Sequence, residues 1–205
     1  MQRNGCVFKQ SIKSVRLRIK TLFLKVLCND IEFNKVVSIL NKYRYAFIKT
    51  DVPYMPGDFP CKIPLGKDAD IVCYKEDIES IALEIEDILK NYKRYEVLTI
   101  QKDNGIQIRI QYKDMLVYQI DLRFELKSIN HGFVDEALKN RIYNRRYYIL
   151  DPKYEFIIRM DAYHEKKQKE YHCQYLKNHM DDYNPGLVHC YLEYDLNELL
   201  KNEGA

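Results

Sequence analysis

The chain has 205 residues, of which 46% are hydrophobic and 31% charged, as in an ordinary globular protein long enough to bury a core. Its 33 lysines and arginines exceed its 30 aspartates and glutamates by three, a surplus too small to favour binding to a long nucleic acid. No window approaches about 18 uncharged apolar residues, so we expect no transmembrane helix.

Six cysteines are scattered along the chain, with no C-x-x-C pair and no dense framework. In a chain of this size the pattern indicates reduced thiols rather than disulfides. The first 28 residues carry seven lysines and arginines among their apolar positions, unlike the uncharged centre of a signal peptide. We therefore predict a cytoplasmic protein.

Residues 1–44 are expected to form two helices packed on the core. Between Ile12 and Val26, apolar residues recur at helical spacing with basic residues between them, which predicts an amphipathic helix. We favour packing against its own domain, and weak contact with an anionic membrane through residues 9–27 is the alternative. Asn29 and Glu32 resemble a capping box at the start of a second helix that runs to Leu40.

Residues 45–126 read as the core of the protein. A loop at 51–66 holds four of the six prolines. Alternating apolar residues and turn residues mark the strands around it, and one amphipathic helix interrupts them. The expected strands are 45–49, 68–74, 97–100, 106–110 and 116–125, and the expected helix is 78–89.

Residues 127–205 are predicted to be mainly helical. The helices are expected near 133–139, 153–168, 170–181 and 190–201, with a short strand near 147–150. The fold class is therefore α+β, a mixed or antiparallel sheet flanked by helices, with a helical C-terminal region.

Two aspartates stand at the start of the second predicted strand. Asp68 and Asp70 would point to the same side of that strand, roughly 7 Å apart, and their like charges would repel. A hard divalent cation relieves such repulsion and leaves positions for phosphate oxygens. A further aspartate, Asp121, lies on the polar side of strand 116–125. Exposed aspartates on solvated strand faces are the structural alternative.

The order of these elements resembles the nucleotidyltransferase superfamily, whose fold is shared with DNA polymerase β, over about residues 45–126. The motifs that carry the resemblance are GKDADIVCY and VYQIDLRF. It implies that Asp68, Asp70 and Asp121 are catalytic residues that bind Mg²⁺ or Mn²⁺, and that Asp121 could also act as a base. The segment from Ile149 to His179 is similar to the helical segment of uncharacterised bacterial nucleotidyltransferase-like proteins, some of them linked to surface-polysaccharide genes.

The resemblance implies transfer of a nucleotidyl group from a nucleoside triphosphate to a small acceptor, such as a sugar or sugar phosphate. Members of the family usually carry a Gly-Ser pair upstream of D-x-D, where it binds the triphosphate, and this chain has no Gly-Ser. Lys49 and Thr50 could replace it through a charge and a hydroxyl. The alternative is a catalytically inactive binding protein or antitoxin-like protein of the same fold.

Four other basic residues are candidates for binding the substrate. Lys67 precedes D-x-D, and Arg123 follows Asp121 by two residues. Arg145 and Arg146 belong to a run of basic and aromatic residues that would suit a phosphate, although a half-buried loop explains the run equally well. The histidines and cysteines of residues 164–190 match no common zinc spacing, so packing is the simpler explanation for them.

Overall fold

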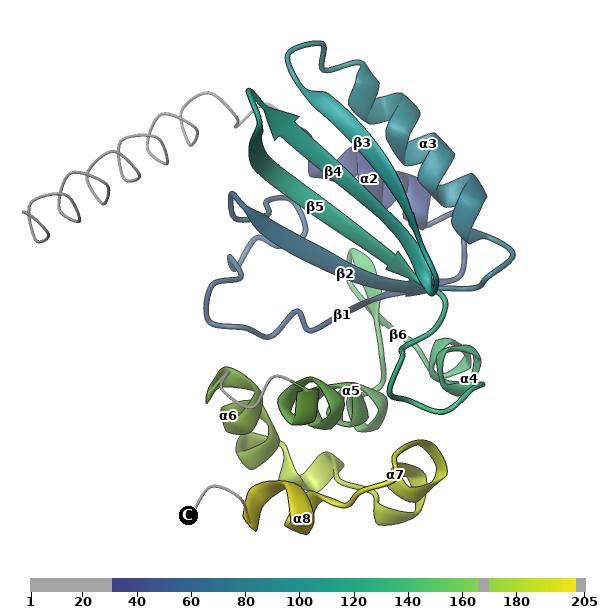
Figure 1. Ribbon diagram of the computed structural model, residues 1–205, viewed down its shortest axis with the longest axis vertical. Coiled ribbons are helices and arrows are strands. Elements are labelled where there is room, and N and C mark those ends of the chain that lie inside the picture. The colour runs from purple at the N-terminus through teal and green to yellow at the C-terminus, as the bar shows by residue number, and fades with distance from the viewer. Residues whose placement is uncertain (1–30, 166–169, 202–205) are drawn as a thin grey trace, which may run out of the picture.

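The computed structural model describes residues 31–165 and 170–201 (Figure 1). The helix predicted between Ile12 and Val26, with its suggested membrane contact, lies outside these residues, as does Asn29 of the capping box. A seven-stranded sheet has the order β3-β4-β5-β2-β1-β7-β6. Its strands are β1 (Tyr45–Ile48), β2 (Lys67–Cys73), β3 (Glu96–Lys102), β4 (Gly105–Tyr112), β5 (Met115–Arg123), β6 (Ile142–Asn144) and β7 (Tyr147–Ile149).

Helices lie on both sides of the sheet, which is covered on both faces only near β1 and β2 (Figure 1). On one face lie α2 (Phe33–Leu40) and α3 (Ile78–Lys90). Beyond the other lie α4 (Phe133–Lys139), α5 (Pro152–Glu165), α6 (Glu170–Asn178), the 3₁₀ turn η1 (Met180–Asp182), α7 (Pro185–Tyr191) and α8 (Leu196–Lys201). This mixed sheet with flanking helices confirms the predicted α+β class.

Alternation along β1 and β2 separates two hydrophobic cores. Phe47 and Ile71 belong to the core beneath α2 and α3, whereas Ile48 and Val72 belong to the core formed with α4–α8. Successive side chains of a strand point to opposite faces, so a four-residue strand can contribute to both cores. At β1 and β2 the sheet is therefore covered on both sides, and Asp68 and Asp70 stand on the side of Val72.

The order of strands brings distant parts of the chain together. β2 pairs antiparallel with β1 and parallel with β5, and the three predicted strands β3, β4 and β5 form an antiparallel meander. Asp103 and Asn104 form the two-residue turn between β3 and β4. The next residue is Gly105. Strand β5 passes so close to it that a Cβ there would lie 2.0 Å from the Leu122 carbonyl oxygen. The glycine thus allows β4 to pair with β5.

The C-terminal region differs from its prediction in two places. The strand predicted near 147–150 is present as β7, but β6 precedes it, and β7 pairs in parallel with β1. The prediction of one helix at 190–201 is wrong, because this part of the chain contains the end of α7, a break, and then α8. Asn184 caps α7 by accepting the Leu187 N–H at 3.0 Å, and Pro185 suits the first position of a helix. Residues 127–205 thus add two strands to the sheet of the core.

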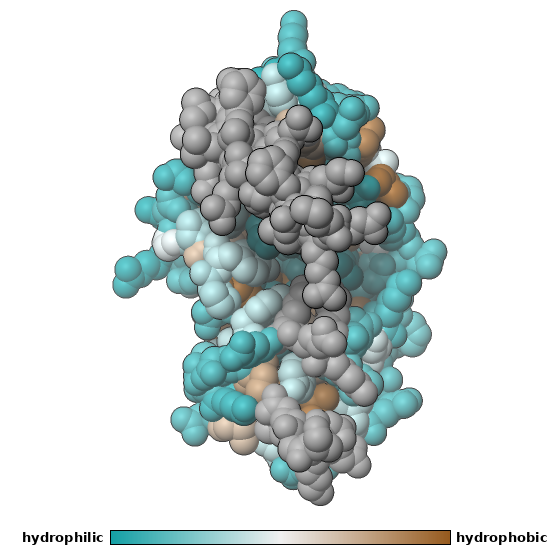
Figure 2. All heavy atoms as spheres, turned by 60° about the vertical axis from the view of Figure 1, so that its left-hand side comes forward, coloured by the Kyte–Doolittle hydropathy of each residue, from teal (hydrophilic) through white to brown (hydrophobic). Residues whose placement is uncertain are grey.

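The surface is mostly polar on the face shown in Figure 2, where hydrophobic residues form small, separate areas. The large hydrophobic side chains that are exposed among the described residues are Tyr54, Leu83, Ile142, Tyr143 and Met180. None of the helices in the described part of the chain has the length and apolar character needed to cross a bilayer. The four cysteines that the structure describes are free thiols.

Candidate metal centre and substrate site

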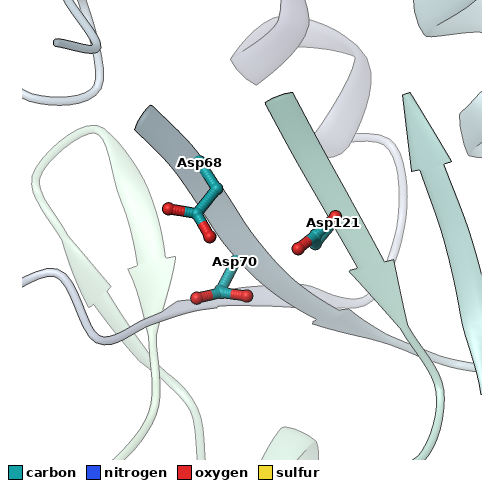
Figure 3. A group of neighbouring side chains, drawn as sticks. All are labelled: Asp68, Asp70 and Asp121. Atoms are coloured by element: carbon teal, nitrogen blue, oxygen red, sulfur yellow. The ribbon is translucent and has the colours of Figure 1, made fainter. Parts of the chain in front are cut away.

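Three carboxylates meet where β2 and β5 pair (Figure 3). Asp70 lies directly opposite Asp121 in the parallel ladder, and Asp68 lies opposite Gln119. Carboxylate oxygens of the three aspartates come within 4.8 Å of one another. Among the described residues, no other cluster of histidines, cysteines and acidic side chains offers three such ligands. Asp121 is only 6% exposed, so the alternative of a solvated strand face does not describe it.

Amide and guanidinium groups surround the carboxylate of Asp121. Gln107, its neighbour on β4, donates to Oδ1 at 2.9 Å, and Gln119 donates to both oxygens at 3.2 and 3.3 Å. Arg123 approaches Oδ2 to 3.3 Å. Such donors compensate a buried negative charge and hold the carboxylate in one orientation. The sequence does not mark Gln107 and Gln119 as site residues, although both alternate with apolar residues in predicted strands.

Two cations contact Asp70. The ammonium of Lys49 lies 2.6 Å from Oδ2, and the guanidinium of Arg123 lies 3.4 Å from Oδ1. All three side chains are largely shielded from water, Asp70 most strongly at 11% exposure. Of the predicted substrate-binding residues, these two are thus brought directly to the carboxylates.

Asp68 differs from its two neighbours, because no described side chain donates a hydrogen bond or forms an ion pair with it. It borders a cavity of about 50 Å³ beside the carboxylates. The cavity is lined by Phe47, Ile48, Lys49, Val52, Tyr54, Met55, Phe59, Asp68, Ala69, Asp70, Ala162, Tyr171 and His172. Burial raises the pKa of Tyr54 to about 12, and Tyr171, Asp68 and Asp70 add to this effect. Tyr54 therefore remains a neutral phenol at the edge of this acidic site.

The donor set fits a hard divalent cation. The three ligands are all carboxylates, as Mg²⁺ and Mn²⁺ prefer, and the cluster contains none of the thiolate or imidazole groups that favour zinc. Counted formally, three negative charges face the two positive charges of Lys49 and Arg123. Among these five described side chains the negative charges exceed the positive charges by one, which favours a cation at this position.

The other predicted substrate residues lie around the site or apart from it. The ammonium of Lys67 lies 4.5 Å from the ring centroid of Tyr54, at the edge of the cavity. Thr50 follows Lys49 but does not line that cavity. Arg145 and Arg146 are exposed in the turn between β6 and β7 and do not line it either. Arg146 donates to the sulfur of Cys61 at 3.2 Å, so this turn contacts the β1–β2 loop.

A buried ion pair on α5 supports the chain that enters the site. Arg159 is completely buried, and its Nε donates to Glu155 Oε1 at 2.7 Å. The same guanidinium donates to the Asp51 carbonyl at 3.0 Å, lies 3.4 Å from His172 Nδ1 and covers the ring of Tyr175. The spacing of Glu155 and Arg159 suggests an ordinary i,i+4 pair, and its burial is visible only in the fold.

Asp161, also on α5, is a partly buried carboxyl that we expect to reduce stability at neutral pH. Burial raises its pKa to about 6 from 3.8, and the nearby charge of Glu165 adds to the effect. Its Oδ1 is buried and accepts no hydrogen bond within the described residues. The folded protein thus binds more protons than the unfolded chain between about pH 4 and 6, so stability falls as the pH rises through this window.

Asp161→Asn is expected to raise the free energy of unfolding at pH 7.5 by about 1–2 kcal/mol, after allowance for partial exposure. Below about pH 4 the two proteins should be equally stable. Urea unfolding followed by circular dichroism from pH 4 to 8 measures the difference. Asp181→Asn, at an exposed position, is the control and should leave the pH profile unchanged. Parallel profiles for wild type and Asp161→Asn would contradict the expectation.

No family model matches the chain, and no curated protein matches it. The structure is similar to the solution structure of the antibiotic-resistance factor ANT(2'')-Ia, with 12% identity, a TM-score of 0.38, and coverage of 83% of this chain and 81% of that one. It is also similar to an antigenic nucleotidyltransferase-like protein from Paracoccidioides brasiliensis (12% identity, TM-score 0.35, coverage 74% and 75%). A third similar structure is the Megavirus polyadenylate synthase (8% identity, TM-score 0.32, coverage 70% and 32%). All three overlap with the chain only in part.

Proposed function

We propose that this protein is a divalent-metal-dependent nucleotidyltransferase that moves a nucleotidyl group from a nucleoside triphosphate to a small acceptor, such as a sugar or sugar phosphate. One observation carries the proposal: Asp68, Asp70 and Asp121 converge from two adjacent parallel strands, with oxygens within 4.8 Å. The acceptor hydroxyl would attack the α-phosphorus, form a P–O bond and expel pyrophosphate. Mg²⁺ or Mn²⁺ held by the three carboxylates would stabilise the charge on the attacking and leaving oxygens.

The residues around the carboxylates suit separate roles in this reaction. Asp121 accepts hydrogen bonds from two glutamines, which supports its role as a fixed ligand. Removal of the acceptor proton by Asp121 would require it to give up one of these hydrogen bonds. Asp68, to which no described side chain donates, lines the cavity and is partly exposed, so a bound ion could reach it. We assign Lys49, Thr50, Lys67 and Arg123 to the phosphates, and Arg145 and Arg146 to a more distant part of a substrate.

A second candidate is a catalytically inactive protein of the same fold that binds a partner. The ion pair of Lys49 with Asp70 favours it, because an ammonium there can replace a metal ion permanently. The absent Gly-Ser pair points the same way. In that case nucleotide and metal would leave the protein unaffected, and a partner protein would take the place of a substrate.

A thermal-shift screen separates the two candidates. We expect one of ATP, GTP, CTP and UTP to raise the melting temperature by several degrees with Mg²⁺ and by much less with EDTA, since a ligand that binds only the folded state stabilises it. Mg²⁺ without nucleotide is the matched control. No shift with any triphosphate, in Mg²⁺ or Mn²⁺, would contradict the proposed transferase and favour the inactive protein.

A further inference from the structure

Lys49 has an unusual backbone conformation at the entrance of the site. It follows β1 directly and has a φ of 56°, in the left-handed region that residues with a Cβ rarely adopt. Its N–H donates to Glu155 Oε1 at 2.8 Å. The acceptor of this hydrogen bond lies on α5, more than 100 residues later in the sequence. The hydrogen bond holds the backbone of Lys49 in the strained conformation.

The carboxylate that accepts this hydrogen bond is itself fixed. Arg159 donates to the same Oε1 of Glu155 at 2.7 Å, and it also donates to the carbonyl of Asp51, two residues after Lys49. Helix α5 therefore holds the chain on both sides of Thr50. As a result, the Lys49 side chain leaves a fixed backbone and reaches Asp70, with its ammonium 2.6 Å from Oδ2.

The ammonium contacts one of the two oxygens that Asp70 could offer to a metal ion. Mg²⁺ binds carboxylate oxygens at about 2.1 Å and demands nearly ideal geometry, so an oxygen in contact with an ammonium at 2.6 Å is a weaker ligand for it. Two cations on one carboxylate also repel each other strongly where water is largely excluded. Lysine has a flexible four-carbon stem, so its ammonium can move while its backbone stays in place.

We propose that Lys49 is an internal competitor of the metal: its ammonium neutralises Asp70 in the metal-free protein and leaves that carboxylate when a divalent cation binds. The released ammonium then faces the cavity that Lys49 lines beside Asp68. This inference rests on the proposed function only in taking the three aspartates as metal ligands. It assigns to Lys49 a role that precedes nucleotide binding.

The test measures binding of the metal alone. Lys49→Met keeps the length of the side chain and removes its charge, and it should bind Mn²⁺ about tenfold more tightly than wild type in calorimetric titration without nucleotide. Lys49→Arg, which keeps a cation, should retain the wild-type affinity. Lys62→Met removes the same charge from an exposed pair with Asp58 in the β1–β2 loop and should have no effect.

Melting temperatures distinguish competition from a purely structural role. In EDTA, Lys49→Met should melt below wild type, because Asp70 has lost its closest cation. Saturating Mn²⁺ should raise its melting temperature by more than it raises that of wild type. An equal deficit in EDTA and in Mn²⁺, with unchanged Mn²⁺ affinity, would overturn the role of Lys49 and leave the metal site intact. If neither protein bound Mn²⁺, or if Asp121→Asn bound it as well as wild type, the metal site itself would be refuted, and the competition with it.

Discussion

Asp121→Asn is expected to lower the rate of nucleotidyl transfer by about 10³-fold without unfolding the protein. Loss of a carboxylate ligand removes several kcal/mol of charge stabilisation in the transition state. The stability should change little in the absence of metal, since the substitution relieves repulsion among three carboxylates within 4.8 Å but turns one oxygen that accepts from Gln119 into a donor. Asp68→Asn and Asp70→Asn should lose activity in the same way. Lost activity without lost stability is the pattern expected of residues kept for function.

Pyrophosphate release measures this effect, with the triphosphate that gives the largest thermal shift and a panel of sugars and sugar phosphates as acceptors. Asp103→Asn is the matched control, because this carboxylate is almost fully exposed in the turn between β3 and β4. Turnover by Asp121→Asn within tenfold of wild type would show that the triad does not carry out the reaction.

Arg159→Met is expected to have the largest effect on stability, about 3–5 kcal/mol in the free energy of unfolding. The substitution leaves the Glu155 carboxylate, whose pKa burial already raises, without its guanidinium partner. It also removes the hydrogen bond to the Asp51 carbonyl. The double variant Arg159→Met/Glu155→Gln should recover a large part of the loss, because no unpaired charge then stays buried.

Urea unfolding followed by circular dichroism at 222 nm suits this measurement, since the chain has no tryptophan. Lys90→Met is the matched control: it breaks an i,i+4 ion pair with Glu86 on α3, and Lys90 is 59% exposed. Exposed pairs of this kind contribute about 0.5 kcal/mol or less. If Arg159→Met lowered the free energy of unfolding by no more than Lys90→Met does, the buried pair would contribute no more to stability than an exposed pair.

The sequence predicts the elements well where periodicity is strong. Helix α3 and the meander β3–β4–β5 follow from apolar residues at the spacing of a helix and of strands, and the two-residue turn Asp103–Asn104 follows from its turn residues. Strand β6 has three exposed residues and no alternation to reveal it. The helix predicted at 190–201 joined two short helices across a break that apolar spacing does not show.

The site is predictable only in part, because pairing between strands is a tertiary property. Alternation places Asp121 on the polar side of its strand, and the family resemblance brings it to Asp68 and Asp70. No local pattern shows that Asp70 pairs with Asp121 across about 50 residues of sequence. The hydrogen bond from Lys49 to Glu155 likewise joins segments that only the assembled fold brings together.

The parallel pairing of β7 with β1 has a consequence for how the protein can be divided. A fragment ending near residue 126 would contain all three carboxylates, but β1 would become an open edge strand and Lys49 would lose the acceptor of its N–H. We therefore expect formation of the candidate site to depend on folding of the C-terminal region. A ligand bound at the carboxylates should therefore protect amide hydrogens of α5 from exchange as well as those of β2 and β5.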